Sequence, residues 1–525
     1  MKKPHYEGRL LIYFTKKYYF GDLMTNKKRF IRDGIMLSLV AILTRGVSMA
    51  FSAFLSGAVG SDGLGLFTLV MTVYSFALTL ATSGVGLAVM RAVASDYENR
   101  RSSLRSALLY SAAFGFLSCL ILIALAPFIC SRLISAPEAL PLLHILALTL
   151  PAVALTSALG GYFIGVRRVR SNALVQIFSQ LLRIILCYAL VSSGEAVGRE
   201  ALRLIAISIL ITEVASLALM AIQYLIDRSI HRSPLIKRGK VSDIASVALP
   251  LALSQYVRSA LISIEHLLIP KRLIHGGLSS EQALSGYGIL HGMALPAILL
   301  PMSPLSSFSG LLVPEFAEDE AAGNKARMSS LTCRAIRAAL AYAILVSAVI
   351  FAFSAELGEA IYSSAEAGKY LRILAPVIPI MYLDHVADQI LKGVGEQVYS
   401  MWVNIADSAI SLVLVFVLLP RLGVPGYAVV IIAMETFNFL MSVSRLAKRV
   451  SLRGIFSPDL LLPIPSAVIA CLISSRIFIS HAYADATAPL LYKICFAICL
   501  FVFLDRIFSV FLCNIYKRKK ATNFF

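Results

Sequence analysis

The sequence predicts an all-α polytopic membrane protein with about 14 transmembrane helices. Of its 525 residues, 58% are hydrophobic and 15% are charged, and the mean hydropathy is +0.81. Repeated apolar runs of about 20 residues, which a soluble core does not need, are typical of membrane-spanning helices. The formal net charge of +19 arises from basic residues in short loops and tails. This pattern indicates cytoplasmic loops rather than nucleic-acid binding.

Fourteen apolar runs define the predicted spans. They lie at about 33–57, 64–90, 106–130, 140–165, 171–192, 202–226, 242–270, 285–313, 331–353, 370–391, 399–419, 425–444, 457–480 and 487–512. A basic tail at 1–32 precedes them, and its apolar piece is too short for a signal peptide. A second basic tail at 513–525 follows. Basic clusters recur in alternate loops, which predicts a multi-pass protein of the cell membrane with both termini in the cytoplasm.

Two stretches with the same fourteen-residue spacing indicate an internal repeat. Pro151 to Gly165 and Pro379 to Gly393 each end a span and precede a polar-faced one. Six spans per repeat would give two lobes with pseudo-twofold symmetry around a central cavity, an arrangement that places a substrate path between two bundles. The predicted domains are lobes at 33–226 and 242–446, a cytoplasmic linker at 227–241, and two additional helices at 455–512. Chance coincidence of two Gly and Pro pairs is the alternative explanation.

The span at 242–270 is apolar except for Arg258 and Glu265. Seven residues are about two helical turns, so both side chains project from one face. A charge near the bilayer centre costs about 2.5–3.5 kcal/mol on insertion scales, and should therefore face the bundle interior or a wet cavity. Four prolines and several glycines interrupt the next span, which is tolerated only where other helices or water satisfy the freed backbone groups. Together the two spans predict a polar pathway.

Arginines within other apolar spans extend this pathway. Arg45, Arg183 and Arg258, together with Glu265 and His291, are the predicted substrate-binding residues of the cavity. Arginine stays charged and presents a planar fork of donors, so the set predicts an anionic, phosphorylated substrate. For each residue the alternative is a static pair between helices, such as Arg183 with Glu213.

Acidic residues in later spans are predicted to couple transport to an ion. They are Asp384, Asp388 and Asp407. His291 and His385 are either proton-coupling groups or hydrogen-bonded structural histidines. No metal site is expected, because His385 points away from the face shared by Asp384 and Asp388. No phosphate loop, nucleotide fold or nucleophile elbow is visible, so neither a cofactor nor an enzymatic activity is predicted.

Three stretches resemble the stage V sporulation protein B family. They are Gly63-Leu-Gly-Leu-Phe-Thr followed by Leu78-Thr-Leu-Ala-Thr-Ser-Gly-Val, His266-Leu-Leu-Ile-Pro-Lys-Arg-Leu, and Tyr287-Gly-Ile-Leu-His-Gly-Met-Ala-Leu-Pro followed by Leu311-Leu-Val-Pro-Glu. That family belongs to the oligosaccharide and lipid flippase branch of the multidrug/oligosaccharidyl-lipid/polysaccharide exporter superfamily. The resemblance covers about residues 30–450. It implies two six-helix lobes with alternating access, and first-helix arginines in a cationic cavity.

The resemblance also implies the function. It indicates a flippase that moves an undecaprenyl-diphosphate-linked saccharide, such as lipid II, to the outer leaflet for cell-wall or spore-cortex peptidoglycan synthesis. The expected partners are the lipid bilayer, this substrate and cell-wall synthesis proteins, and no nucleic acid. Two alternatives remain open: a cation-coupled multidrug exporter, which would favour an acidic cavity, and a non-transporting membrane scaffold for cell-wall or spore assembly.

Overall fold

The structure is a computed structural model, and it describes residues 7–82, 84–95, 100–134, 136–166, 168–193, 199–230, 241–452, 458–477 and 487–522. Parts of the predicted tails and linker lie outside these ranges, namely 1–6, 231–240 and 523–525. The regular elements within the described ranges are helices, which confirms the predicted class. Residues 7–32 of the predicted tail form the start of the first helix.

The helices follow one another in this order: α1 (Glu7–Thr82), α2 (Val85–Ser95), α3 (Arg100–Phe128), η1 (Ile129–Ile134), η2 (Pro137–Ala139), α4 (Leu140–Ala147), α5 (Leu150–Gly165), α6 (Val169–Ser193), α7 (Arg199–Ile230), α8 (Val241–His275), α9 (Ser280–Tyr287), η3 (Gly288–Ala294), α10 (Leu295–Leu299), α11 (Met302–Ala321), α12 (Lys325–Ala352), α13 (Ser354–Tyr362), α14 (Ala365–Leu374), η4 (Ala375–Val377), α15 (Ile378–Gly393), α16 (Gln397–Arg449), η5 (Pro458–Leu461), α17 (Pro463–Ile477) and α18 (Thr487–Thr522).

Within the described residues, eight helices are long and apolar enough to cross a membrane. The bent pair Ser280–Leu299 and Met302–Glu320 would make a ninth span, with a bend of 59° between its parts. Two of the long helices each contain two predicted spans, joined at glycines with positive φ: Gly60 in α1 (77°) and Gly423 in α16 (64°). Only glycine adopts such angles readily, so these are the turns between spans. The count of fourteen remains a prediction.

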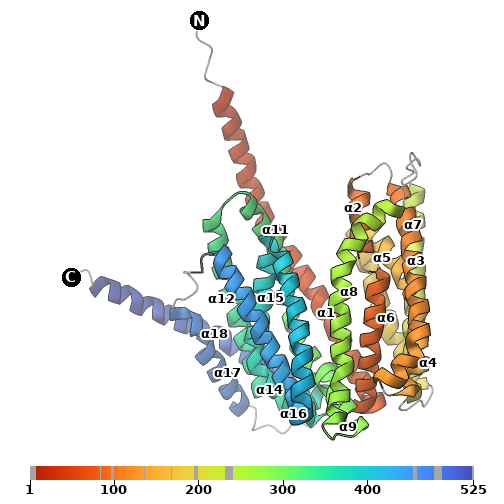
Figure 1. Ribbon diagram of the computed structural model, residues 1–525. Coiled ribbons are helices and arrows are strands. Elements are labelled where there is room, and N and C mark those ends of the chain that lie inside the picture. The colour runs from red at the N-terminus through yellow and green to blue at the C-terminus, as the bar shows by residue number, and fades with distance from the viewer. Residues whose placement is uncertain are drawn as a thin grey trace.

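The helices form two bundles (Figure 1). The first bundle contains α2 to α7, and the second contains α11 to α18. The helices α1 and α8 lie between them, and α8 packs against both α1 and α16. The bundles come together near α9 and diverge toward the opposite end, beyond which the start of α1 projects (Figure 1). We call these the α9 end and the N-terminal end.

The predicted repeat corresponds to two broken spans of equal length. Pro137–Gly165 and Ala365–Gly393 each cover 29 residues. Each consists of a short helix, an interruption and a final helix of 16 residues with a proline in its first turn. Proline fits there because the first-turn N–H has no partner inside the helix. This likeness supports the pseudo-symmetry, while the domain boundaries remain predictions.

Glycines allow the bundles to meet at the α9 end. A Cβ on Gly65 would lie 2.0 Å from the carbonyl oxygen of Leu284, and one on Gly288 would lie 2.4 Å from that of Ser61. The hydroxyls of Ser61 and Ser285 are 2.6 Å apart. At these positions α1 and the α9–η3 segment therefore approach backbone to backbone, and a side chain would force them apart.

We expect Gly65→Ala to destabilise the protein by about 1–3 kcal/mol, the usual cost of overpacking, because the new methyl group would clash with Leu284. The matched control is Gly57→Ala in the preceding span of α1, where no atom lies within 4 Å of the added Cβ. Thermal unfolding of the detergent-solubilised protein should show a lower Tm for the first variant alone. Equal Tm values for the two variants would contradict the close approach.

Each bundle is closed near the N-terminal end by an ion pair, and the two pairs have opposite polarity. Arg168 follows the end of α5 by three residues and pairs with Asp227 of α7, which also accepts a hydrogen bond of 2.7 Å from Tyr162. Glu396 follows the end of α15 by three residues and accepts hydrogen bonds from Arg445 and Arg449 of α16. The turn after α5 thus carries the basic partner, Arg168, and the equivalent turn after α15 carries the acidic partner, Glu396.

The hydrogen bond from Arg445 is the main reason why the pKa of Glu396 lies below its ordinary value. A carboxylate with a lowered pKa stabilises the fold above its unfolded pKa of about 4.3, and this contribution disappears as the pH falls through the folded-state value. We expect Glu396→Gln to lower the Tm at pH 7. The difference from the unmodified protein should shrink below about pH 4. A constant difference across this range would argue against the ion pair.

Candidate functional site

Three of the cavities among the described residues have hydroxyl or charged side chains in their linings. The α1–α8 cavity, of about 610 Å³, lies between those helices and is lined by Met71, Thr72, Ser75, Thr79, Gln255, Arg258, Ser259, Ile262, Ser263 and His266. The first-bundle cavity, of about 510 Å³, lies among α2, α5, α6 and α7 and includes Glu213. The second-bundle cavity, of about 400 Å³, lies among α8, α10, α11, α15 and α16. A lining of hydroxyls and charges in apolar helices is typical of a transport pathway.

The second-bundle cavity gathers most of the acidic groups of the spans. Asp384 and Asp388 of α15 line it together with Asp407 and Glu435 of α16. Asp388 forms an ion pair of 2.7 Å with Lys392, one turn away. Among the described residues, one oxygen of Asp384 and one of Asp407 are buried without a hydrogen-bond partner. These two carboxylates could therefore take a cation or a proton, whereas Asp388 already has its counter-ion.

Arg258 lines both the α1–α8 cavity and the second-bundle cavity. Its side chain is exposed. Within the described part of the chain it forms no hydrogen bond or ion pair. Seven residues further along α8, Glu265 accepts a hydrogen bond from Ser411 of α16 and is not paired with Arg258. Arg258 therefore presents its guanidinium donors to the space where the two cavities meet.

Arg45 has a different environment, at the break between α10 and α11. Its Nη1 donates to the carbonyl oxygen of Leu299 at 2.8 Å. Tyr382 and Tyr342 donate to the neighbouring carbonyls of Ile298 and Pro301 at 2.8 and 2.6 Å. The proline-rich span thus has its freed carbonyls satisfied by side chains of adjacent helices, as a broken span requires. Arg45 stabilises this break and does not line any of the three cavities.

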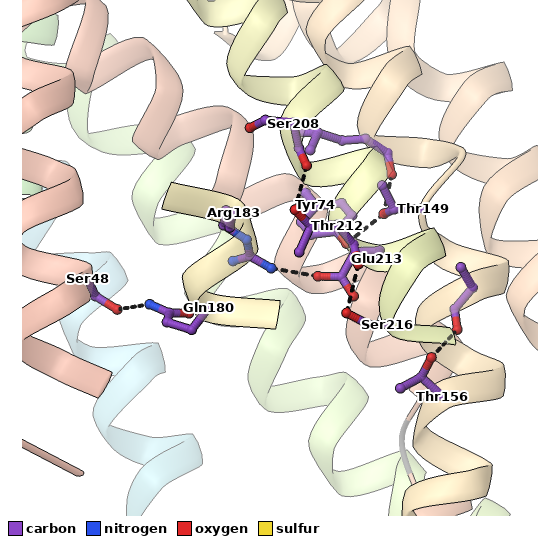
Figure 2. Close-up of polar contacts among 12 residues, drawn as sticks. Ser48, Tyr74, Thr149, Thr156, Gln180, Arg183, Ser208, Thr212, Glu213 and Ser216 are labelled. Atoms are coloured by element: carbon purple, nitrogen blue, oxygen red, sulfur yellow. Dashed lines mark hydrogen bonds and ion pairs between the residues drawn. The ribbon is translucent and has the colours of Figure 1, made fainter. Parts of the chain in front are cut away.

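Arg183 forms the static pair that was the alternative prediction. Its Nη2 lies 2.6 Å from Oε1 of Glu213, and the two side chains are 27% and 15% exposed. Figure 2 shows Arg183 of α6 directed toward Glu213 of α7, and Gln180, one turn away, directed toward Ser48 of α1 at 3.2 Å. The guanidinium of Arg183 is thus paired within the first bundle, with Glu213, which lines the first-bundle cavity.

His291 does not line any of the three cavities either. It lies in η3 and forms a hydrogen bond with the hydroxyl of Tyr427. His385 does line the second-bundle cavity, with its Nε2 2.9 Å from the hydroxyl of Ser306. Of the five residues predicted for substrate binding, the structure therefore places Arg258 in the cavities and the other four in contacts between helices. The three predicted acidic residues share one cavity.

Sequence reasoning missed several polar residues of these cavities. Asn438 lines the second-bundle cavity beside the carboxylates, and Thr72, Ser75 and Thr79 line one side of the α1–α8 cavity. The three hydroxyl residues recur every three or four positions, which places them on one face of α1. That spacing could have been used to predict a polar face of α1 from the sequence. Among the described residues, no group of three or more His, Cys, Asp or Glu could hold a metal ion.

Comparison with protein families gives two matches. The profile of the family described as polysaccharide biosynthesis protein matches residues 30–319. The profile of the MatE family matches residues 271–417. The first match covers more than half of the chain, including α8 and the broken span that follows it.

Two relatives come from Bacillus subtilis (strain 168). Stage V sporulation protein B is 23% identical over 436 residues, which cover 80% of this chain and 84% of that protein. Sporulation protein YkvU is 23% identical over 396 residues, which cover 74% of this chain and 88% of that protein. The predicted resemblance to the first of these is confirmed.

Solved structures share the fold. The lipid II flippase MurJ, in an inward closed conformation, superposes with a TM-score of 0.70 at 13% identity, covering 91% of this chain and 100% of that one. An inward-facing multidrug resistance MATE family transporter of the MOP superfamily gives a TM-score of 0.64 at 16% identity, covering 82% and 99%. The fold is thus that of polytopic transporters, and neither the families nor these structures are enzymes.

Proposed function

The chain belongs to the polysaccharide biosynthesis protein family, and from this premise we propose that it flips an undecaprenyl-diphosphate-linked saccharide, such as lipid II, from the inner to the outer leaflet. In this proposal the two bundles alternate between access at the N-terminal end and access at the α9 end. The substrate serves peptidoglycan synthesis in the cell wall or the spore cortex.

The observation that carries the proposal is the position of Arg258. Its guanidinium lines two cavities at once and makes no hydrogen bond or ion pair with the described residues. Arginine binds phosphate through two parallel hydrogen bonds, which are stronger than those between neutral groups. The hydroxyl-lined wall of α1, with Thr72, Ser75 and Thr79, supplies further donors for phosphate or sugar oxygens. A diphosphate headgroup fits this combination.

The acidic cavity supplies the energy coupling in this account. Asp384 and Asp407 are the proposed ion-binding residues, because each retains a buried carboxylate oxygen without a partner among the described residues. Glu435 joins them, whereas Asp388 is held by Lys392. Binding of a cation or proton here would change the charge beside Arg258 and thus its affinity for an anionic substrate.

Two further points of the proposal rest on the loop charges and on the relatives. The basic loops support an orientation with both termini in the cytoplasm, which would make the N-terminal end the cytoplasmic end. The names of the two Bacillus relatives support a role in sporulation. Cell-wall synthesis proteins would then be the interacting partners.

A cation-coupled multidrug exporter is the second candidate function. The carboxylates of the second-bundle cavity favour it, since an acidic lining attracts cationic drugs. The MatE profile and the MATE transporter fold are consistent with it. In this case Arg258 would oppose substrate binding rather than promote it.

Ligand-induced stabilisation of the purified protein distinguishes the two candidates. A ligand that binds the folded state raises the Tm, and the rise grows with the ratio of its free concentration to its Kd. We expect lipid II to raise the Tm and a lipophilic cationic dye to leave it unchanged. Stabilisation by the dye alone would favour the exporter and would contradict the flippase.

A further inference from the structure

Four aromatic rings form a contiguous cluster where the bundles meet near the α9 end. They belong to His266 of α8, Tyr287 of α9, His291 of η3 and Tyr427 of α16. The centroids of the two imidazoles are 4.4 Å apart. The rings of Tyr287 and Tyr427 lie 4.8 and 5.2 Å from that of His291. We call these four residues the histidine–tyrosine cluster.

Each imidazole of the cluster has a tyrosine hydroxyl as partner. Nδ1 of His266 lies 2.8 Å from the hydroxyl of Tyr287, and Nε2 of His291 is hydrogen-bonded to the hydroxyl of Tyr427. A neutral imidazole has one accepting nitrogen, so each tyrosine can donate to its histidine. Tyr287 is 0% exposed and Tyr427 is 3% exposed. With both imidazoles neutral, each tyrosine hydroxyl and the ring nitrogen that faces it form a hydrogen bond away from water.

We propose that the His266–His291 pair is a proton-binding site whose protonation opens the α9 end. A proton on His266 turns Nδ1 from an acceptor into a donor and places a positive charge beside the second imidazole. A buried charge without a counter-ion is unfavourable, and two like charges at this separation repel each other. Both effects are relieved when the helices separate and water enters. Two of the rings come from α9 and η3, which pack backbone to backbone against α1 at Gly65 and Gly288. Displacing these rings from α8 and α16 therefore loosens the contact that closes the α9 end.

A path for the proton exists on one side of the cluster. His266 lines the α1–α8 cavity, as do Ser259, Ser263 and Thr72. His291 lies behind it, against Tyr427. The first proton would therefore reach His266 from the cavity, and the closed α9 end would be its barrier.

Among the described residues no carboxylate forms an ion pair with either imidazole, although Glu265 lies close enough to interact electrostatically with Tyr287 and Tyr427. Glu265 is adjacent to His266 in sequence, but successive residues of a helix do not face each other, and its carboxylate accepts a hydrogen bond from Ser411. The facing stretch of α1, residues 63–82, contains no charged residue. The other ionisable residues of the elements packed against the cluster are Tyr256, Arg258, Lys271, Arg272 and His275 of α8 beyond Pro250, Glu281 of α9, Arg45, Asp62 and Tyr74 of α1 from Arg45 onward, Glu366, Lys369, Tyr370 and Arg372 of α14, and Tyr399, Asp407, Arg421, Glu435, Arg445, Lys448 and Arg449 of α16.

The proposal goes beyond substrate transport, because it concerns a conformational equilibrium that exists without substrate. Spin labels at Ser131→Cys and Arg421→Cys would report the separation of the bundles, in a full-length chain whose eight native cysteines are replaced. Both positions are exposed, in η1 of the N-terminal half and in α16 beside the contact of Gly276 with Pro420. Electron–electron distance measurement in lipid nanodiscs requires no substrate and no transport activity.

Between about pH 8 and pH 5, where an imidazole changes its charge, the distance distribution should shift toward a longer component. An unchanged distribution in this unsubstituted background would overturn the proposal by itself. In His266→Gln/His291→Gln the shift should disappear, while the control His275→Gln, an exposed histidine on the same helix, should retain it. Persistence of the full shift in the double variant would also overturn the proposal.

Tyr427→Phe provides a test that preserves the ring packing. This variant removes only the hydroxyl that bonds His291. The midpoint of the distance change should move to higher pH, because the neutral imidazole loses its donor and is destabilised relative to the protonated form. A midpoint identical to that of the unmodified cluster would contradict the proposal that protonation of this histidine–tyrosine cluster drives the change.

Discussion

Replacing Arg258 by alanine should weaken binding of an undecaprenyl-diphosphate-linked saccharide by about 10- to 100-fold. The loss corresponds to about 1.5–3 kcal/mol, the contribution of hydrogen bonds to a charged group. Arg258 forms no hydrogen bond or ion pair among the described residues, and only its longer-range attraction to Asp407 would be lost, so we expect folding to be retained. The measurement is the lipid II Kd of the purified variant, obtained from the dependence of its Tm on lipid II concentration and compared with that of the unmodified protein.

Two variants sharpen this test. Arg258→Lys keeps the charge but loses the planar fork, so it should recover part of the affinity. Arg421→Ala removes an exposed arginine that lines none of the three cavities, and should bind like the unmodified protein. Equal losses in Arg258→Ala and Arg421→Ala would mean that net charge, and not the position of Arg258, governs binding.

Replacing Arg183 by alanine should destabilise the protein by about 3 kcal/mol. Removing one partner of a buried ion pair leaves an uncompensated charge at a typical cost of 3–5 kcal/mol. We expect the lower end of that range because Arg183 is 27% exposed and Glu213 is 15% exposed. The apparent Tm of the detergent-solubilised protein is the measurement.

The matched control is the double variant Arg183→Gln/Glu213→Gln, which removes both charges and keeps side chains that can hydrogen-bond. It should be more stable than Arg183→Ala, because replacing a buried pair by neutral groups is often nearly neutral. If both variants unfolded at the same temperature, the charge of Glu213 would not be the cause, and the packing of the arginine stem would explain the loss.

The class of fold could be predicted from the sequence because the bilayer imposes a strict length and polarity on each span. The repeat was visible in the positions of Pro151, Gly165, Pro379 and Gly393, since proline at a helix start and glycine at its end are local signals. The count of spans was harder to test. At Gly60 and Gly423 the chain turns through a single glycine. The helices before and after each glycine follow one another without a loop between them.

The site could be predicted only in part. The helical period places Arg258 and Glu265 on one face. It does not reveal that Ser411, which lies on a helix far along the chain, donates a hydrogen bond to Glu265. The role of Arg45 was hidden for the same reason, because its partner is a backbone carbonyl freed by the break at Pro301. The hydrogen-bond partner of a polar side chain in a membrane helix depends on which helices pack against it. Contacts between residues far apart in the sequence leave no local pattern from which they could be predicted.

The most direct test of the proposed function is complementation of cells depleted of their lipid II flippase, with an assay for lipid II in the outer leaflet. The account predicts rescue by the unmodified protein and by Arg421→Ala, and no rescue by equally expressed Arg258→Ala. Rescue by Arg258→Ala as complete as that by the unmodified protein would contradict the role of this arginine. Absence of lipid II from the outer leaflet with well-expressed unmodified protein would contradict lipid II as the substrate.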